Sequence, residues 1–452
     1  MLSRVYPLLL LLVVGVLVVG MVGCNGGIVD PNTTDPNTTD PNTSDPNTTD
    51  PNTTDPNTTD PNTTDPNTAE LTIVKTSIAM RHDADIEAGD DLIAYGTDTL
   101  VGVSYMVPSE GESSAKAVTN SEKFDSSGFA VGGKTIFLAG SNTADLMFQV
   151  AVFDTETETL TVIDPNEIYL NSIPVSADDT GNIQADGDYC IVICNQNEVA
   201  DGAIIKVIDV SGETPVVVSL PNPDGVDYAG GVDMVQVDAE SMKAVAVADG
   251  KITIYDLENP QAAPIVAAPV NEAGGDVQVE MDQGYLIGLD DQSYPQAFLV
   301  NLDDGNVITM TDAEATFDVA IAGAAYAFFA DYDADDSMGG SQRTAVGSVP
   351  NPAFTKVARE DYIDGSTNNN GWVGYAGSMD VAAEGDYIFL ADSYLQYSTG
   401  GPSFTVPADP DGEDTYGCPA WDVDCTINTV AFKTAETRSD NTTVTVGYIA
   451  LP

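Results

Sequence analysis

The sequence is short of histidine and of positive charge. It contains one histidine, His82, and 14 Lys and Arg residues against 71 Asp and Glu residues. A single histidine leaves little material for Ser-His-Asp, Cys-His or histidine-based metal catalysis. No Gly-rich phosphate-binding loop with a lysine occurs in the sequence. We therefore expect a protein that is not an enzyme.

The charge imbalance also excludes classes of partner. The formal net charge of −57 repels nucleic-acid phosphates and anionic lipid headgroups, so we expect no nucleic acid partner. Charged residues make up only 19% of the chain, so the acidity reflects a shortage of Lys and Arg as much as an excess of Asp. We interpret it as a means of staying soluble in saline surroundings, where salt screens the self-repulsion.

The amino terminus has the pattern of an export signal. Arg4 precedes an apolar run, Leu8–Val22, and Gly23-Cys24 follows it. Met21-Val22-Gly23-Cys24 resembles the lipobox of bacterial lipoprotein signal peptides, which implies that residues 1–23 are removed and that Cys24 is lipidated. The alternative is an uncleaved membrane anchor, because the run is close to the length that spans a bilayer. Both interpretations place the folded part in the cell envelope, facing the periplasm or the exterior.

Residues 24–68 form the predicted linker. Pro-Asn-Thr-Thr-Asp and close variants run from Pro31 to Thr68. The regular prolines favour extended backbone, and the repeated Asp adds mutual repulsion. At about 3.1 Å per residue this tract reaches on the order of 100 Å when fully extended. We expect a disordered stalk.

From residue 69 onward the sequence has the pattern of a β protein. Runs rich in Val, Ile, Tyr and Phe alternate with Gly, Asn, Asp and Pro turns. The clearest unit, Asp380–Asp392, joins a short strand through a glycine turn to a hydrophobic strand ending in Ala-Asp. This second strand recurs at Leu92–Thr97, Thr135–Gly140, Tyr189–Cys194, Ala244–Asp249, Tyr285–Asp290, Tyr326–Asp331 and Tyr387–Asp392.

Several units continue into a third strand that ends on Asp, as in Val207-Ile208-Asp209, and into a short fourth strand. Four antiparallel strands per unit predict an all-β fold, a β-propeller of about seven four-stranded blades, whose radial closure protects the sheet edges. We expect the propeller to occupy residues 69–452, with an insertion at 393–426. An array of β-sandwiches is the alternative architecture.

Parts of these units resemble a known family. Gly231–Ala268, Ser378–Asp392 and Asp201–Ser211 are similar to the LVIVD repeat of bacterial and archaeal surface propellers. In that repeat an Asp-Val inner strand precedes a Tyr-led strand ending in Ala-Asp and a third strand closing in Ile-Asp-Ile-Ser. The resemblance implies a β-propeller surface lipoprotein of bacteria, in a family mostly without assigned catalysis.

The starts of the inner strands are the first candidate site, because these strands line the channel of a propeller. A partial ring of carboxylates there would bind a cation or a polar ligand on the axis. The structural alternative is that each side chain caps neighbouring backbone N–H groups. The candidate residues are Asp85, Asn182, Asp233, Asp276, Asp318 and Asp380.

Two acidic loops have spacings that suit calcium, the one cofactor that the sequence suggests. Neither is a full EF-hand loop, and bound calcium would hold together loops that otherwise repel themselves. Chance clustering in an Asp-rich chain is the alternative. The carboxylates are Asp331, Asp333 and Asp335 in the first loop and Asp409, Asp411 and Glu413 in the second.

The cysteines other than Cys24 fall into two pairs. Cys418 and Cys425 flank a short turn-rich segment and are expected to form a disulfide in an oxidising exterior. Cys190 and Cys194 lie in one predicted strand, about 13 Å apart at a rise of about 3.3 Å per residue. They cannot pair with each other, so we expect two buried thiols.

The insertion is the predicted recognition loop, because aromatic side chains among polar turns suit sugar or protein contacts. An ordinary insertion that caps a blade is the alternative. The aromatic residues are Tyr394, Tyr397, Phe404, Tyr416 and Trp421.

The leading functional hypothesis is a non-catalytic, monomeric lipoprotein, anchored to the membrane through Cys24. Its propeller would act as a binding or scaffolding module for protein or polysaccharide. Two other classes stay open. One is a carbohydrate-active hydrolase or lyase that uses channel carboxylates, and the other is a purely structural component of the envelope.

Overall fold

The computed structural model describes parts of the chain between residues 73 and 450. Contacts divide the chain into Met1–Thr64 and Asp65–Pro452, and all described residues belong to the second unit. The predicted signal peptide and the linker tract lie outside the described residues. The described ranges are 73–80, 85–97, 102–121, 124, 128–142, 147–164, 166–168, 183–194, 200–228, 231–268, 279–289, 296–310, 315–323, 325–331, 342–356, 381–384, 387–390, 396–397, 404–405, 420–426, 429–435 and 444–450.

Within these ranges, six four-stranded antiparallel sheets each use four consecutive strands. The first three hold β2 (Ile86–Gly89), β3 (Leu92–Gly96), β4 (Val103–Met106) and β5 (Lys116–Ala117); β6 (Phe129–Gly132), β7 (Thr135–Asn142), β8 (Met147–Asp154) and β9 (Thr159–Val162); and β10 (Ile183–Asp186), β11 (Tyr189–Ile193), β12 (Ile205–Asp209) and β13 (Val216–Ser219). The next three hold β14 (Met234–Asp238), β15 (Lys243–Ala248), β16 (Lys251–Asp256) and β17 (Ile265–Ala267); β18 (Val279–Asp282), β19 (Tyr285–Leu289), β20 (Ala297–Asn301) and β21 (Val307–Thr309); and β22 (Ala315–Ala322), β23 (Ala325–Asp331), β24 (Gln342–Ser348) and β25 (Phe354–Lys356). Two short 3-10 helices, η1 (Pro108–Glu110) and η2 (Glu112–Ser114), lie between β4 and β5.

The remaining strands follow a different pattern. β26 (Val381–Glu384) pairs with β27 (Tyr387–Leu390), and β28 (Gln396–Tyr397) pairs with β29 (Phe404–Thr405). A seventh four-stranded sheet has the order β1-β32-β31-β30. It joins the strands at the two ends of the described chain: β30 (Ala420–Thr426), β31 (Thr429–Ala435), β32 (Val444–Ala450) and β1 (Ile73–Met80).

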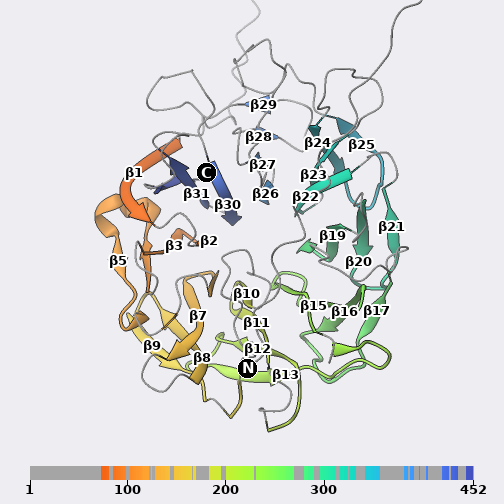
Figure 1. Cartoon of the computed structure of the whole chain (residues 1–452), viewed down its shortest axis with the longest axis horizontal. Coiled ribbons are helices and arrows are strands. Elements are labelled where there is room, and N and C mark those ends of the chain that lie inside the picture. The colour runs from red at the N-terminus through yellow and green to blue at the C-terminus, as the bar shows by residue number, and fades with distance from the viewer. Residues whose placement is uncertain are drawn as a thin grey trace, which may run out of the picture. The chain divides into compact units, whose positions relative to one another are not determined.

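The first strands of these groups form a closed ring. Neighbouring contacts run from β2 through β6, β10, β14, β18, β22, β26 and β30, and β30 contacts β2 again. Figure 1 shows the colour passing around this ring from the orange β2 to the blue β30. Antiparallel four-stranded sheets arranged radially are the blades of a β-propeller. The predicted fold class is therefore confirmed.

The sheet that closes the ring depends on both ends of the chain. β1 pairs antiparallel with β32, with Ile73 opposite Ile449 and Met80 opposite Val444. The hydroxyl of Thr76 donates a hydrogen bond of 2.7 Å to the carbonyl of Val446. The first strand of the described chain is thus the outer strand of the last sheet, a pairing that converts an open row of sheets into a ring.

The core lies between neighbouring sheets rather than inside any one of them. All five residues of β3 are buried, because a second strand is covered on both faces by the adjacent sheets. One apolar cluster joins Ile191 and Val207 of the third sheet to Val235 and Ala246 of the fourth. This packing explains why the second strands are the most hydrophobic segments of the sequence.

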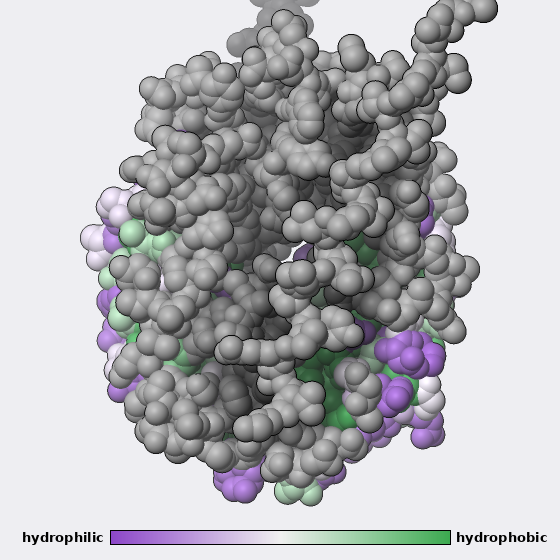
Figure 2. Space-filling model, viewed as in Figure 1, coloured by the Kyte–Doolittle hydropathy of each residue, from purple (hydrophilic) through white to green (hydrophobic). Residues whose placement is uncertain are grey.

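The outer strands, in contrast, are partly exposed. Val162 in β9, Val216 in β13, and Ile265 and Val266 in β17 have exposed fractions between 36% and 54%. Where described surface is visible in Figure 2, purple hydrophilic and green hydrophobic residues alternate along its edge. The sequence pattern is weakest in these strands because only one face of each is covered.

All seven second strands expected from the sequence are present, as β3, β7, β11, β15, β19, β23 and β27. The ring holds one further unit, the closing sheet, whose second strand is β31. The range 393–426, for which we expected an insertion, contains β28, β29 and β30. β30 is the inner strand of the closing sheet, so this range carries part of the ring itself.

We predict that Gly132→Ala lowers stability by about 1–3 kcal/mol, as overpacking does. A Cβ at Gly132, the last residue of β6, would lie 2.6 Å from the carbonyl oxygen of Gly187 in the next sheet. Gly212→Ala is the matched control, because its nearest neighbour would be 3.9 Å away. Urea denaturation of both variants measures the effect. Equal stability of the two variants would contradict this close contact.

Candidate functional site

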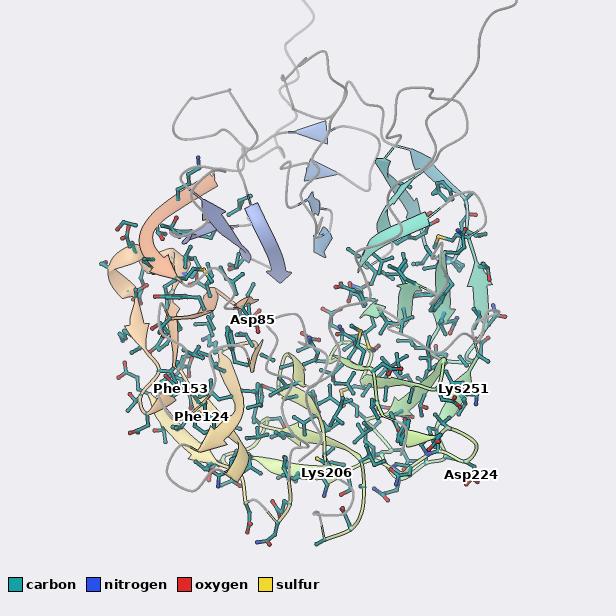
Figure 3. The ribbon with its side chains drawn as sticks, viewed as in Figure 1. Asp85, Phe124, Phe153, Lys206, Asp224 and Lys251 are labelled. Atoms are coloured by element: carbon teal, nitrogen blue, oxygen red, sulfur yellow. The ribbon has the colours of Figure 1, made fainter. Side chains whose placement is uncertain are left out.

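Two of the predicted channel residues are described at the starts of inner strands. Asp85 directly precedes β2 and is buried, and its carbonyl accepts a hydrogen bond of 3.0 Å from the N–H of Gly96. Figure 3 shows it on the side of the first sheet nearer to the centre of the ring. Asp233 directly precedes β14 and is exposed, and its N–H donates to the carbonyl of Val247 at 2.8 Å. Both backbones thus tie the first strand to the second.

The other channel candidates are less fully described. Asp318 lies within β22, opposite Phe329 of β23, next to an irregularity of the register. Asn182, Asp276 and Asp380 lie outside the described residues. The ring of carboxylates therefore stays a prediction.

The opposite ends of the inner strands carry a repeated contact that the sequence analysis missed. Here the last residue of one inner strand is an Asp, and its carboxylate accepts a hydrogen bond from a backbone N–H in the turn of the next sheet. We call these the carboxylate links. Asp186 accepts from Ala239 at 2.7 Å, Asp238 accepts from Gly284 at 3.3 Å, and Asp282 accepts from Gly323.

Glycine occupies the same position in the first two sheets. Gly89 ends β2 and Gly132 ends β6, and neither has room for a Cβ because a carbonyl oxygen of the next sheet approaches. Asp90 then donates its N–H to the carbonyl of Gly133 at 2.9 Å. One position of the repeat therefore joins sheets in two ways, through close backbone contact or through a carboxylate.

The carboxylate links carry an electrostatic cost. Burial raises the pKa of Asp282 to about 6, the Gly323 hydrogen bond opposes this, and the negative charges of Asp238, Glu240 and Asp186 add to it. Burial also raises the pKa of Asp186. The neighbouring charged residues that contribute to these two pKa shifts are all acidic. Protonation at low pH therefore reduces the repulsion among them.

We predict that Asp186→Ala destabilises the protein by about 1–3 kcal/mol, because it leaves the N–H of Ala239 without its acceptor. Asp186→Asn keeps an acceptor oxygen and should retain most of the stability. Asp188→Ala is the control, since Asp188 is exposed in the same turn. Thermal melting of the three variants gives the comparison. An Ala variant as stable as the Asn variant would argue against the link.

We predict that Asp282→Asn raises the melting temperature near neutral pH and loses this advantage in mild acid. The folded-state pKa of about 6 lies above the usual value of about 3.9. The folded protein therefore binds this proton more tightly, and the wild type gains stability as pH falls from about 6 to about 4.

Melting curves of the wild type and of Asp282→Asn across this range test the prediction. Asp224→Asn removes an exposed carboxylate, seen at the outer edge in Figure 3, and controls for the general effect of net charge. Parallel curves for the wild type and Asp282→Asn would rule out the proposed titration.

A charged cleft of about 270 Å³ lies between the first and second sheets. Lys134 pairs with Glu156 at 2.7 Å, and Lys116 pairs with Glu158 at 2.7 Å. The second pair joins the two sheets, because Lys116 is in β5 and Glu158 follows β8. All four side chains are more than half exposed, so solvent screens both pairs and they add little to stability. Mainly polar and charged side chains thus line the boundary between these two sheets.

A second cavity, of about 330 Å³, lies at the outer edge of the third sheet, beside the β16–β17 connection of the fourth. We call it the polar pocket. Its lining comes from the β11–β12 connection, the end of β13 and the β16–β17 connection. The lining residues are Asp201, Gly202, Ala203, Ser219, Leu220, Pro221, Asn222 and Gln261.

A buried lysine lies behind this pocket. Lys206 in β12 has a side chain that is 4% exposed, and its Nζ lies 2.9 Å from the carboxylate of Asp201. Burial opposes ionisation of Asp201, but hydrogen bonds from Ser219, Lys206 and Ala203 prevail and lower its pKa to about 2. Figure 3 shows Lys206 near the outer part of the third sheet. Because Lys206 and Ser219 are opposite each other in the β12–β13 ladder, the register itself directs both to Asp201.

Most other predicted site residues lie where the structure describes no side chain. Five lie in strands whose backbone alone is described: Asp331 in β23, Tyr397 in β28, Phe404 in β29, and Trp421 and Cys425 in β30. The rest lie outside the described residues: Cys24, Asp333, Asp335, Tyr394, Asp409, Asp411, Glu413, Tyr416 and Cys418. The described residues include no group of three or more acidic, histidine or cysteine side chains arranged to hold a metal.

Cys190 and Cys194 are both buried, as expected. Burial raises the pKa of the Cys190 thiol, so it stays protonated and unreactive. These two residues are part of the apolar packing between the second and third sheets.

No family model matches the chain, and no curated protein matches its sequence. Among solved structures, the β-propeller domain of the Trilobed protease from Pyrococcus furiosus is 11% identical, with a TM-score of 0.41 over 82% of this chain and 95% of that one. The computationally designed Ika8 protein is 11% identical, with a TM-score of 0.48 over 83% and 100%. The β-propeller domain of Cps50 (Swd1) from Myceliophteria thermophila is 9% identical, with a TM-score of 0.42 over 84% and 100%. Similarity this distant says nothing about function.

Proposed function

We propose that the protein is a non-catalytic lipoprotein of the cell envelope whose β-propeller binds or scaffolds protein or polysaccharide. One observation carries the proposal: the chain enters the ring at β1, the outer strand of the closing sheet. The tract 31–68 and the lipobox-like Cys24 precede this strand in the sequence. Tethering through the residues that precede an outer strand would leave the inner strands and their connections available to a partner.

The two rims differ in the length of their connections. On the rim where inner strands end, each passes to its second strand through a short turn, such as 187–188 and 283–284. In the sequence, many residues separate some described strands that end and begin on the rim where inner strands begin, as in 163–182, 357–380 and 406–419, although residues 249–250 alone separate β15 from β16. Because recognition residues concentrate in loops held by a rigid scaffold, we assign the binding role to the rim with long connections.

Several of the predicted recognition and calcium residues, all outside the described residues, follow second or fourth strands in the sequence. The β23–β24 connection carries Asp333 and Asp335, and the β29–β30 connection carries Asp409, Asp411 and Glu413. In an antiparallel blade, connections from second to third strand and from one blade to the next reach the same rim. Tyr394 and Tyr416 belong to such connections as well. Calcium in these loops and a Cys418–Cys425 disulfide would hold that rim in shape.

Capture from envelope extracts tests the proposed function. The full-length protein, immobilised and incubated with envelope protein and polysaccharide fractions, is expected to retain a ligand and to release it chemically unchanged. Release of shortened sugar products would instead favour the carbohydrate-active enzyme. Retention of nothing from either fraction would contradict a binding role.

The tether has its own test. Cys24→Ser should move the protein from the membrane fraction to the soluble fraction and abolish incorporation of labelled fatty acid, because the lipid supplies the membrane affinity. Cys190→Ser is the control, since that thiol is buried. Unchanged membrane retention of Cys24→Ser would favour the uncleaved anchor.

A further inference from the structure

The polar pocket presents side chains that are fixed in place yet keep hydrogen-bonding capacity. The amide oxygen of Asn222 accepts from the N–H of Ile204 at 3.3 Å, and its nitrogen donates to the carbonyl of Gly202 at 3.4 Å. The amide nitrogen of Gln261 donates to the carbonyl of Ser219 at 2.9 Å. A carboxamide has two donors and two acceptor positions, so each amide can still make bonds to a ligand.

Asp201 is fixed more firmly still. Its carboxylate accepts from the N–H of Ala203 at 3.1 Å, from Lys206 at 2.9 Å and from the hydroxyl of Ser219. Its side chain nevertheless remains 44% exposed. A group held by several protein contacts loses little entropy when a ligand binds. The pocket is therefore preorganised from both sheets that form it.

The charge of the pocket differs from that of the protein. Among the described residues of the lining, Asp201 is the one charged side chain, and the ammonium of Lys206 balances it. The pocket thus offers a near-neutral set of donors and acceptors within a chain of net charge −57. Such a set suits an uncharged ligand with many hydroxyl groups, each of which both donates and accepts. Leu220 and Pro221 supply an apolar wall for the ligand's C–H groups.

An extended peptide fits this surface less well. A peptide added to the outer strand β13 would need a continuous row of backbone donors and acceptors along that strand. Pro221, which follows β13 in the lining of the pocket, has no N–H to donate to such a peptide. The volume of about 330 Å³ lies near the lower end of the range of about 300–1,000 Å³ for small-molecule sites.

We propose that the polar pocket is a binding site for a neutral saccharide, with Asp201, Asn222 and Gln261 as the groups that bind its hydroxyls. This inference rests on the proposed function and names the class of ligand. Asn222 follows β13 of the third sheet and Gln261 lies in the β16–β17 connection of the fourth, so a bound sugar bridges the third and fourth sheets. Lys206 and Ser219 act as positioning residues for Asp201.

Calorimetric titration of the full-length protein with maltose, cellobiose and N,N′-diacetylchitobiose tests the site. We expect at least one of these disaccharides to bind with millimolar affinity. Asn222→Ala and Gln261→Ala should each weaken that binding about tenfold, the effect of losing one hydrogen bond. Asn166→Ala is the matched control, because that amide lies in an exposed turn on Asp164, away from the pocket. Thermal melting confirms that each variant is folded.

Three results would overturn the proposal: no disaccharide binds, binding is unaffected by both pocket variants, or a neutral Ala-Ser-Gly hexapeptide binds while the sugars do not. Repeating the envelope capture with the Asn222→Ala, Gln261→Ala double variant distinguishes a failure of the pocket proposal from a failure of the proposed function. Equal capture by the double variant and the wild type would refute the pocket while leaving the proposed function standing. A wild type that captures nothing would refute the proposed function itself.

Discussion

The pairing of β1 with β32 is the constraint on which the rest of the structure depends. Each sheet buries its apolar faces against its two neighbours, so no sheet can be stable alone and a row of sheets would expose a face at each end. Joining the first strand to the last three removes both exposed faces at once. The chain thereby gains a single, closed set of sheet interfaces, at the entropic cost of bringing its ends together.

The closed ring determines which parts of each blade can change in sequence without loss of contacts between sheets. One rim is tied by short turns, where Gly89 and Gly132 admit a neighbouring backbone and where the carboxylate links (Asp186, Asp238 and Asp282) accept N–H groups from the next sheet. These contacts leave little freedom for substitution. The position needs either a glycine, which leaves room for a neighbouring carbonyl oxygen, or an aspartate, which accepts a hydrogen bond from the next sheet. The other rim and the outer edge carry the longer connections and the polar pocket. The contacts between sheets and the proposed binding groups thus occupy different parts of the same blade.

Much of this fold could be predicted from the sequence, and the omissions have physical reasons. The second strands were recognisable because burial on both faces demands continuous hydrophobic residues, as in β11 and β19. The closing sheet was missed because its outer strand, β1, lies at the opposite end of the sequence, so no single segment shows the repeat. The carboxylate links were missed because the partner of Asp186 is Ala239, in another repeat. An Asp shortly before the Tyr of the second strand, as in Asp186–Tyr189 and Asp282–Tyr285, was the available signal. The polar pocket gave none, because Asn222 and Gln261 meet only through packing of two sheets.

Cross-linking across the closing pair tests the closed ring most directly. Lys75 lies opposite Gly447 in the β1–β32 ladder, whereas Val444 lies opposite Met80. In the full-length protein, Lys75→Cys with Gly447→Cys should form a disulfide within one chain, found as one linked peptide by mass spectrometry, and should raise the melting temperature. Lys75→Cys with Val444→Cys is out of register and should remain unlinked. Equal linkage of both pairs, or linkage of the first pair between two chains alone, would contradict a ring closed by its own first strand.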